Sequence, residues 1–228
     1  MKTLSKRLSA IAAFVEQDAI IGDIGSDHCA LPIALFKEGR IRGAFAVENK
    51  KGPYTRMKKA IDESSYPIQS SLSSGLDELP KEVDTLILAG LGGPLIVEIL
   101  SKNKDKLQNI KTILIDAHND RALVNDFLEK NGFHIADNVF LAEGNISYDI
   151  MKWNKGKPLR PYTELEKEFG PLNLKRRPKE WLCSLRKSLQ EKERIFSLLK
   201  EENQKKAVLE KEIETLKGIL YENEKSYS

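Results

Sequence analysis

The chain has 228 residues, of which 40% are hydrophobic and 31% charged, and its formal net charge is +3. This composition is typical of a soluble globular protein and excludes a chain disordered throughout; no stretch approaches the roughly 18 apolar residues that span a bilayer, so we expect no membrane association. Two cysteines without C-x-x-C spacing and three histidines without ligand spacing predict neither a disulfide framework nor a metal site.

The first 16 residues have apolar side chains at helical spacing, interrupted by Lys6 and Arg7. A secretory signal would instead need an unbroken apolar stretch between its charged start and its cleavage site. We therefore expect a helix here, no signal peptide and a cytoplasmic protein.

From Ala19 to Trp153, short apolar runs alternate with helical patterns. Such alternation predicts an α/β fold with a mainly parallel sheet and helices on both faces. Only three residues separate the last two runs, which indicates an antiparallel hairpin. The runs cover residues 19–24, 43–47, 68–72, 83–89, 110–116, 133–141 and 145–153. Five helix-linked strands closed by a hairpin give the seven-stranded plan of the class I, Rossmann-like methyltransferase fold, whereas dinucleotide-binding folds continue in parallel.

A turn with one glycine and flanking acids follows the first run, with the sequence Asp23-Ile24-Gly25-Ser26-Asp27-His28. In open parallel sheets, ligands bind outside the carboxyl ends of the strands, where this turn must lie. A dinucleotide site would need the three glycines of G-x-G-x-x-G. The acids suit a cationic ligand that carries an amino acid better than a diphosphate. The alternative is a simple strand-to-helix turn capped by Ser26 or Asp27.

Two further strand ends supply candidates for binding an adenosine. Glu48 ends the second run, where an acid can accept hydrogen bonds from both ribose hydroxyls, and Asn49 lies beside it. Ser74 and Gly75 follow the third run, where an adenine ring would pack beside Leu76. A lone Glu at a strand end is usually just exposed, so the functional interpretation depends on its alignment with Asp23.

A glycine-rich loop, Ala89-Gly90-Leu91-Gly92-Gly93, follows the fourth run. Its nearly bare backbone at the edge of the sheet could admit a flat base beside the bound ligand. The alternative is a tight turn that opens the next helix.

Basic residues are concentrated in one segment of the chain, residues 151–190. Residues 151–190 contain 11 Lys and Arg against 4 Asp and Glu, a local charge of +7. Such a segment is typical of proteins that bind nucleic acid, although a solvated, lysine-rich linker has the same composition. Its prolines and glycine over residues 154–180 indicate a connector with one short helix.

Two apolar stripes with coiled-coil spacing follow the connector. They consist of Leu182, Leu185, Leu189, Phe196 and Leu199, and of Leu209, Ile213, Leu216 and Leu220. The polar run at residues 201–206 favours a turn, and hence a helical hairpin, over one continuous helix of about 60 Å. We expect a domain over residues 1–155 and a second over residues 156–228.

The motifs together resemble the bacterial TrmK family of tRNA (adenine-N1)-methyltransferases, which act on adenine 22 in the D-arm. The resemblance rests on the run Leu4-Ser5-Lys6-Arg7-Leu8, the turn at residues 23–28 with Leu31-Pro32, Gly52-Pro53, the loop at residues 89–93 and the terminal coiled coil. Two departures stand out. The family typically has Met at the position of Leu91, and Gln-Pro-Asn where this chain has Ala117-His118-Asn119.

The resemblance implies S-adenosylmethionine as cofactor and tRNA as partner. Methylated adenine is cationic, so Asp27 is the expected catalytic carboxylate, with Asn119 and His118 as further catalytic candidates; His118 can also be an incidental loop residue. The expected phosphate-binding residues are Lys6, Arg7, Arg160, Lys175, Arg176 and Arg177. We expect a monomer. The alternatives are an enzyme of this fold with another RNA or small-molecule acceptor, and a non-catalytic RNA-binding module that kept the fold.

Overall fold

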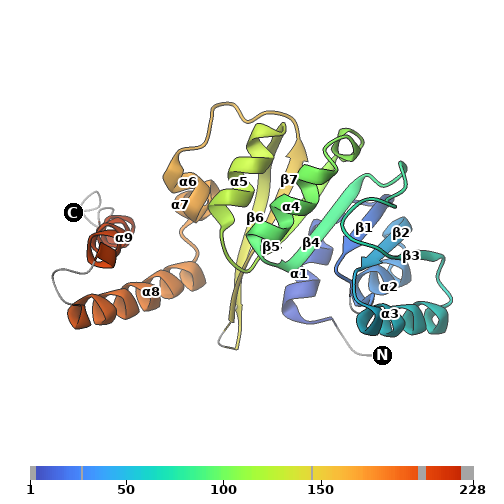
Figure 1. The fold of residues 1–228 in the computed structure, drawn as a ribbon, viewed down its shortest axis with the longest axis horizontal. Coiled ribbons are helices and arrows are strands. Elements are labelled where there is room, and N and C mark those ends of the chain that lie inside the picture. The colour runs from blue at the N-terminus through green and yellow to red at the C-terminus, as the bar shows by residue number, and fades with distance from the viewer. Residues whose placement is uncertain (1–3, 27, 145, 200–203, 222–228) are drawn as a thin grey trace.

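The computed structural model describes residues 4–26, 28–144, 146–199 and 204–221. Its centre is a seven-stranded sheet of order β3-β2-β1-β4-β5-β7-β6, in which β7 is antiparallel to both of its neighbours (Figure 1). The strands are β1 Ala19–Ile24, β2 Ile41–Glu48, β3 Ile68–Leu72, β4 Thr85–Leu91, β5 Thr112–Ala117, β6 Phe133–Glu143 and β7 Ile146–Lys155. This order confirms the α/β fold class and the closing hairpin.

Helices cover both faces of the sheet, as the alternating pattern predicted. Helices α1 (Lys6–Phe14), α2 (Ala30–Lys37) and α3 (Lys51–Ser64) pack on one face, and α4 (Gly93–Lys102) and α5 (Arg121–Lys130) on the other. Successive strand residues point to opposite faces. In β4, for example, Leu86 and Leu88 belong to the core under α4 and α5, whereas Ile87 belongs to the core under α1 to α3.

Two strands begin two residues later than their apolar runs suggest. Val83 and Ile110 are buried in the core but lie in the preceding turns, before β4 and β5 respectively. Between them, Asp84 accepts a hydrogen bond from the Ile20 amide and pairs with Lys111. Hydrophobicity alone cannot distinguish a buried turn residue from the first residue of a buried strand.

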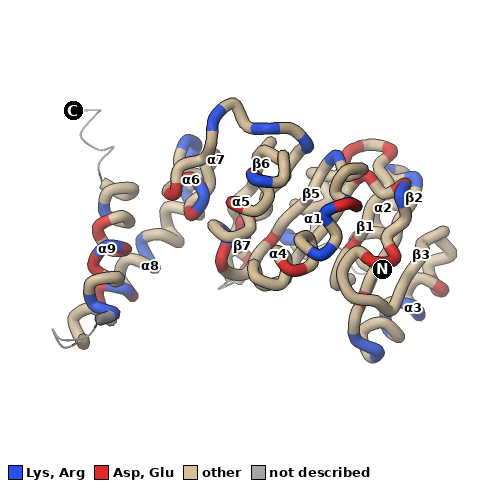
Figure 2. Tube along the Cα trace, turned by 45° about the horizontal axis from the view of Figure 1, so that its top comes forward, with Lys and Arg blue, Asp and Glu red and all other residues tan. Residues whose placement is uncertain are grey.

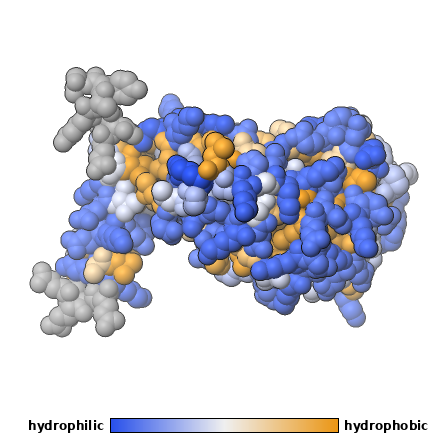
Figure 3. Space-filling view, turned by 90° about the horizontal axis from the view of Figure 1, so that it is seen from above, coloured by the Kyte–Doolittle hydropathy of each residue, from blue (hydrophilic) through white to orange (hydrophobic). Residues whose placement is uncertain are grey.

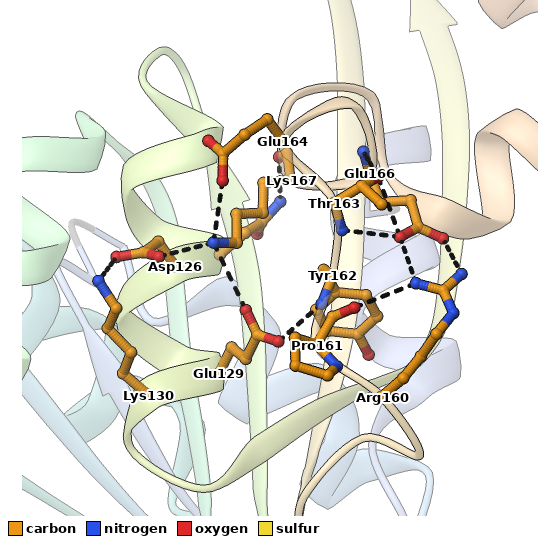
Figure 4. A network of polar contacts seen from close by, with 11 residues as sticks. Asp126, Glu129, Lys130, Arg160, Pro161, Tyr162, Thr163, Glu164, Glu166 and Lys167 are labelled. Atoms are coloured by element: carbon orange, nitrogen blue, oxygen red, sulfur yellow. Dashed lines mark hydrogen bonds and ion pairs between the residues drawn. The ribbon is translucent and has the colours of Figure 1, made fainter.

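The connector contains two short helices, α6 (Glu164–Phe169) and α7 (Pro171–Arg176), where one was expected. Thr163 and Glu166 form a capping box at the start of α6, because each side chain bonds the other's backbone amide. Lys167 reaches from α6 to Asp126 and Glu129 on α5, at 2.8 and 3.7 Å (Figure 4). The connector is therefore fixed against the sheet domain through α5.

A buried polar network ties α7 to the β6–β7 hairpin. Asn173 donates to Asp149 Oδ2 at 2.8 Å, and Asn138 donates to Asp149 Oδ1 at 3.0 Å and to Asn173 Oδ1 at 2.7 Å. All three residues are buried, and Arg121 of α5 lies 3.6 Å from Asp149 Oδ2. Burial raises the pKa of Asp149, whereas the charge of Arg121 and the hydrogen bonds from Asn138 and Asn173 lower it. The start of the C-terminal region is thus anchored by polar contacts as well as by packing.

The last two helices, α8 (Lys179–Leu198) and α9 (Gln204–Tyr221), pack on each other at one end of the molecule (Figure 1). Their shared core contains Trp181, Leu185 and Leu189 of α8 with Ile213 and Leu216 of α9. Phe140 of β6 joins this core, so it is continuous with the hairpin of the sheet. Two separate helices that pack on each other, in place of one continuous helix, are confirmed. The turn between them lies mostly outside the described residues, and coiled-coil packing and the division at residue 155 stay predictions.

Candidate functional site

The main candidate site is a cavity of about 530 Å³ at the carboxyl ends of the parallel strands. Its size falls within the roughly 300–1,000 Å³ of typical small-molecule sites. The ends of β1, β2 and β3 form one side and α4 forms the other. The lining residues are Ile24, Gly25, Val47, Glu48, Asn49, Lys50, Pro53, Ser73, Ser74, Gly75, Asp77, Leu91, Leu95, Glu98, Ile99, Lys102 and Asn103. The cavity joins the predicted adenosine-binding residues from three separate strand ends.

The turn after β1 brings bare backbone and an acid to the cavity. Gly25 has φ +83°, a conformation that favours glycine, and its amide donates to Val47 O at 2.8 Å. Asp23 is only 8% exposed, and burial raises its pKa to about 6, although the Ser26 side chain and the charge of Arg7 each lower it. Asp23 and Ser26 are buried beside the cavity rather than on its wall.

The rest of this turn is only partly described. Asp27, the predicted catalytic carboxylate, lies outside the described residues. His28 is exposed. Cys29 is buried, with φ +51°, and burial raises the pKa of its thiol, which keeps it protonated and supports its interpretation as a small buried residue.

Glu48 is held in a defined orientation at the end of β2. Its Oε1 accepts hydrogen bonds from the amides of Asn49 and Lys50, at 2.9 and 3.0 Å. The residue is 8% exposed and lines the cavity, so Oε2 is the oxygen that can accept from a ligand. Two fixed donors on one oxygen orient the other, an arrangement suited to bind vicinal hydroxyls.

After β3, Ser74 and Gly75 line the cavity as predicted. Leu76 is fully buried, and its side chain belongs to the core rather than to the cavity. Sequence reasoning missed the contribution of α4, which lines the cavity with Leu95, Ile99 and other residues. Their spacing of four along a helix that starts at the glycine-rich loop is the signal that could have found them.

The glycine-rich loop lies against the end of β5, with Ala89 and Gly92 half-buried. A Cβ on Gly93 would lie 2.7 and 2.8 Å from the backbone oxygens of Asn119 and Asp120, so a side chain does not fit. Asn119 Oδ1 accepts from the Gly93 amide at 3.0 Å, and His118 is exposed beside it. Of this loop only Leu91 lines the cavity, so His118 and Asn119, two of the catalytic candidates, lie next to the cavity rather than within it.

Arg7 lies within the site region rather than on the outer surface. It reaches from α1 to the end of β5, where its Nε lies 2.5 Å from Asp116 Oδ2. A Cβ on Gly90 would lie 2.6 Å from Arg7 Nη2, so the guanidinium abuts the glycine-rich loop. Lys6, its neighbour, is exposed.

Most of the other cations expected to bind phosphate have intramolecular partners. Arg160 forms two hydrogen bonds with Glu166, Arg176 lies 2.6 Å from Asp137, and Arg177 donates to the carbonyl of Ile219 at the end of α9. Figure 2 shows acidic residues interspersed with basic ones along α6 to α9. Lys175 is exposed. Three of the four cations predicted in residues 151–190 to bind phosphate thus hold parts of the C-terminal region in place.

No group of three or more His, Cys, Asp or Glu in the described part of the chain is arranged to hold a metal ion. Among the same residues, none of the helices is both long and apolar enough to cross a membrane. Hydrophilic residues dominate the face drawn in Figure 3.

Comparisons with known proteins agree with this geometry. Residues 4–151 match a family described as a methyltransferase domain. The chain is 30% identical over 172 residues to the tRNA (adenine(22)-N(1))-methyltransferase of Bacillus subtilis strain 168. This match covers 74% of this chain and 72% of the B. subtilis protein. The crystal structure of the B. subtilis m1A22 tRNA methyltransferase TrmK is 27% identical, with a TM-score of 0.87, and the match covers 96% of this chain and 99% of that one. A Streptococcus pneumoniae protein solved in complex with S-adenosyl-L-methionine is 30% identical, with a TM-score of 0.88 over 96% of this chain and 100% of that one.

Proposed function

This chain belongs to the tRNA (adenine(22)-N1)-methyltransferase family, and from that premise we propose that it methylates N1 of adenine 22 in tRNA at the cavity described above. The observation that carries the proposal is the oriented Glu48 carboxylate at the end of β2, which lines the same cavity as Ser74 and Gly75 after β3. The family resemblance seen in the sequence motifs is confirmed by these relatives.

The residues present fit S-adenosylmethionine. Glu48 has a free carboxylate oxygen for the ribose hydroxyls, and Gly25 leaves room for close approach of the ligand to the backbone. Asp23 supplies an anion for the ammonium of the amino-acid end. The cavity volume of about 530 Å³ suits a ligand of this size.

When bound, S-adenosylmethionine supplies a methyl group on a cationic sulfur. Adenine N1 carries a lone pair at neutral pH, so the protein needs to position the base rather than remove a proton. The methylated ring is cationic, and a nearby carboxylate lowers the energy of the charge as it develops. Asp27 in that role stays a prediction, as do the roles of Asn119 and His118 in holding the base.

N1 lies on the pairing edge of adenine, so a paired or stacked target must be exposed first, at a cost of a few kcal/mol. Contacts with tRNA phosphates must offset this cost. The exposed Lys6 and Lys175 are the candidates that the structure leaves available, whereas Arg160, Arg176 and Arg177 would have to exchange internal partners for phosphate.

A cytoplasmic monomer is part of the same proposal. The apolar stripes of α8 and α9 bury each other within one chain, which removes the usual reason for such stripes to recruit a second copy. A family named for tRNA methylation also favours tRNA over a small-molecule acceptor, and the oriented Glu48 favours an active enzyme over a non-catalytic module.

The direct test is methylation of a tRNA transcript with S-adenosylmethionine, followed by mass spectrometry of the nucleosides. We expect 1-methyladenosine from a transcript with adenine 22 and none when guanine replaces it. Equal methylation of both transcripts, or none of either, would contradict the proposal.

A matched pair of variants tests the cavity. Glu48→Gln should weaken S-adenosylmethionine binding by about 10- to 100-fold, the value of a charged hydrogen bond, in isothermal titration calorimetry. Glu38→Gln, an exposed acid at the end of α2, should bind as the unmodified protein does. Equal affinities for the two variants would remove Glu48 from the site.

A further inference from the structure

The arrangement around Arg7 has a feature that its ion pair leaves unexplained. The Arg7 guanidinium is fixed on one side by Asp116, which is 2% exposed, and its Cζ lies 5.2 Å from the centre of the Tyr148 ring. Its Nη2 is buried and has no hydrogen-bond acceptor in the described residues. Buried charged donors are rarely left unpaired in native proteins, because the desolvation cost is not offset. The geometry therefore points to an acceptor supplied by a ligand.

The position of Nη2 identifies which part of a ligand could reach it. It abuts the backbone of Gly90, where φ is +77°, and Arg7 is close enough to Asp23 for its charge to lower the pKa of that carboxyl. A cation from α1 and an anion from β1 therefore flank the same end of the site. Glu48 lies at the other end, on β2.

The strand order indicates how a ligand that spans the carboxyl ends of the parallel strands is oriented. From β3 to β5, the residues at the strand ends are Ser74, Glu48, Asp23, Gly90 and Asp116. Neighbouring strands lie about 4.8 Å apart, so β2 and β4 are separated by about 10 Å. If the ribose of S-adenosylmethionine lies at Glu48, its amino-acid end extends past β1 toward β4, where Arg7 lies.

We propose that Arg7 binds the α-carboxylate of the methionyl group of S-adenosylmethionine through Nη2, while Asp23 binds the ammonium. This assignment rests on the proposed function. It replaces the expectation that Arg7 contacts tRNA phosphates, because its side chain is only 21% exposed and Nη2 faces inward.

Charge balance supports the assignment. The Arg7–Asp116 pair is neutral, and Asp23 adds a negative charge that burial makes unfavourable. The bound donor adds a sulfonium, an ammonium and a carboxylate. The filled site then contains three cationic and three anionic groups, each within reach of an opposite charge, which is the condition under which buried charges are tolerated.

The test compares two ligands that differ only at the amino-acid end. S-adenosylhomocysteine retains that end, whereas 5′-methylthioadenosine lacks it, and both are titrated calorimetrically into the full chain. For Arg7→Gln, we expect affinity for S-adenosylhomocysteine to fall about 10- to 100-fold and affinity for 5′-methylthioadenosine to change less than twofold. Arg42→Gln, at the opposite end of β2, is the matched control and should change neither.

Because Arg7→Gln leaves Asp116 buried without its cation, the double variant Arg7→Gln/Asp116→Asn is measured in parallel and should show the same selective loss. Equal loss of both ligands would indicate a purely structural role. Unchanged S-adenosylhomocysteine affinity with weakened tRNA binding would assign Arg7 to the substrate and overturn the inference. If the unmodified protein binds neither ligand, the proposed function itself fails, which is a separate result.

Discussion

Replacing Asp23 with Asn should stabilise the unliganded protein at neutral pH and weaken its binding of S-adenosylmethionine. Burial raises the pKa of Asp23 from 3.8 to about 6, a difference of about 2 units, and each unit corresponds to about 1.36 kcal/mol. The ionised carboxylate therefore costs the folded state up to about 3 kcal/mol. Because the folded pKa is the higher one, this cost is absent below pH 4, grows between pH 4 and 6, and is complete above pH 6.

Urea unfolding at pH 4 and pH 8 measures the effect. Asp23→Asn should raise the free energy of unfolding by up to about 3 kcal/mol at pH 8 and by little at pH 4. The affinity of the variant for S-adenosylhomocysteine should be lower than that of the unmodified protein. The affinity of the unmodified protein should rise as Asp23 ionises near pH 6, and the variant should lack this rise. The same change in stability at both pH values would refute the reasoning, because it would show that ionisation of Asp23 is not its cause.

The remaining predictions concern three other regions. Gly93→Ala should lower kcat/KM for tRNA methylation at least 10-fold, because its Cβ would collide with the backbone after β5; an unchanged value in steady-state assays would show that the loop can yield. Asn173→Ala should lower the free energy of unfolding by about 3 kcal/mol in urea, since it leaves the buried Asp149 with fewer donors; a loss below 1 kcal/mol would contradict this account. Lys175→Glu should weaken tRNA binding and flatten its salt dependence, whereas Arg177→Gln should mainly lower the melting temperature; the reverse pattern in filter binding and calorimetry would reverse their roles.

The sequence predicted the parts of the fold that depend on local patterns. The bounds of β1 and β3 match their apolar runs, and the helical hairpin follows from two apolar stripes and a polar break. Gly25 and Glu48 could be placed because the ends of parallel strands share one edge of a sheet. These inferences need only the periodicity of the chain and the rules of α/β topology.

Long-range contacts could not be predicted in the same way. Arg7 pairs with Asp116, 109 residues away, and a cation in an N-terminal helix gives no local sign that the helix returns to the end of β5. Arg177 likewise binds a carbonyl 42 residues later, in α9. Local charge counts therefore overestimated how many cations are free to bind RNA. The pairing of Arg160 with Glu166, a residue of the capping box only six positions later, is local enough for the sequence to have revealed it.

A crystal structure of the protein with S-adenosylhomocysteine would test the central claim most directly. The ribose hydroxyls should lie within hydrogen-bond distance of Glu48 Oε2, with the adenine near Ser74 and Gly75 and the amino-acid end between Asp23 and Arg7. Electron density for the ligand elsewhere on the protein, or in this cavity with its two ends reversed, would contradict the account.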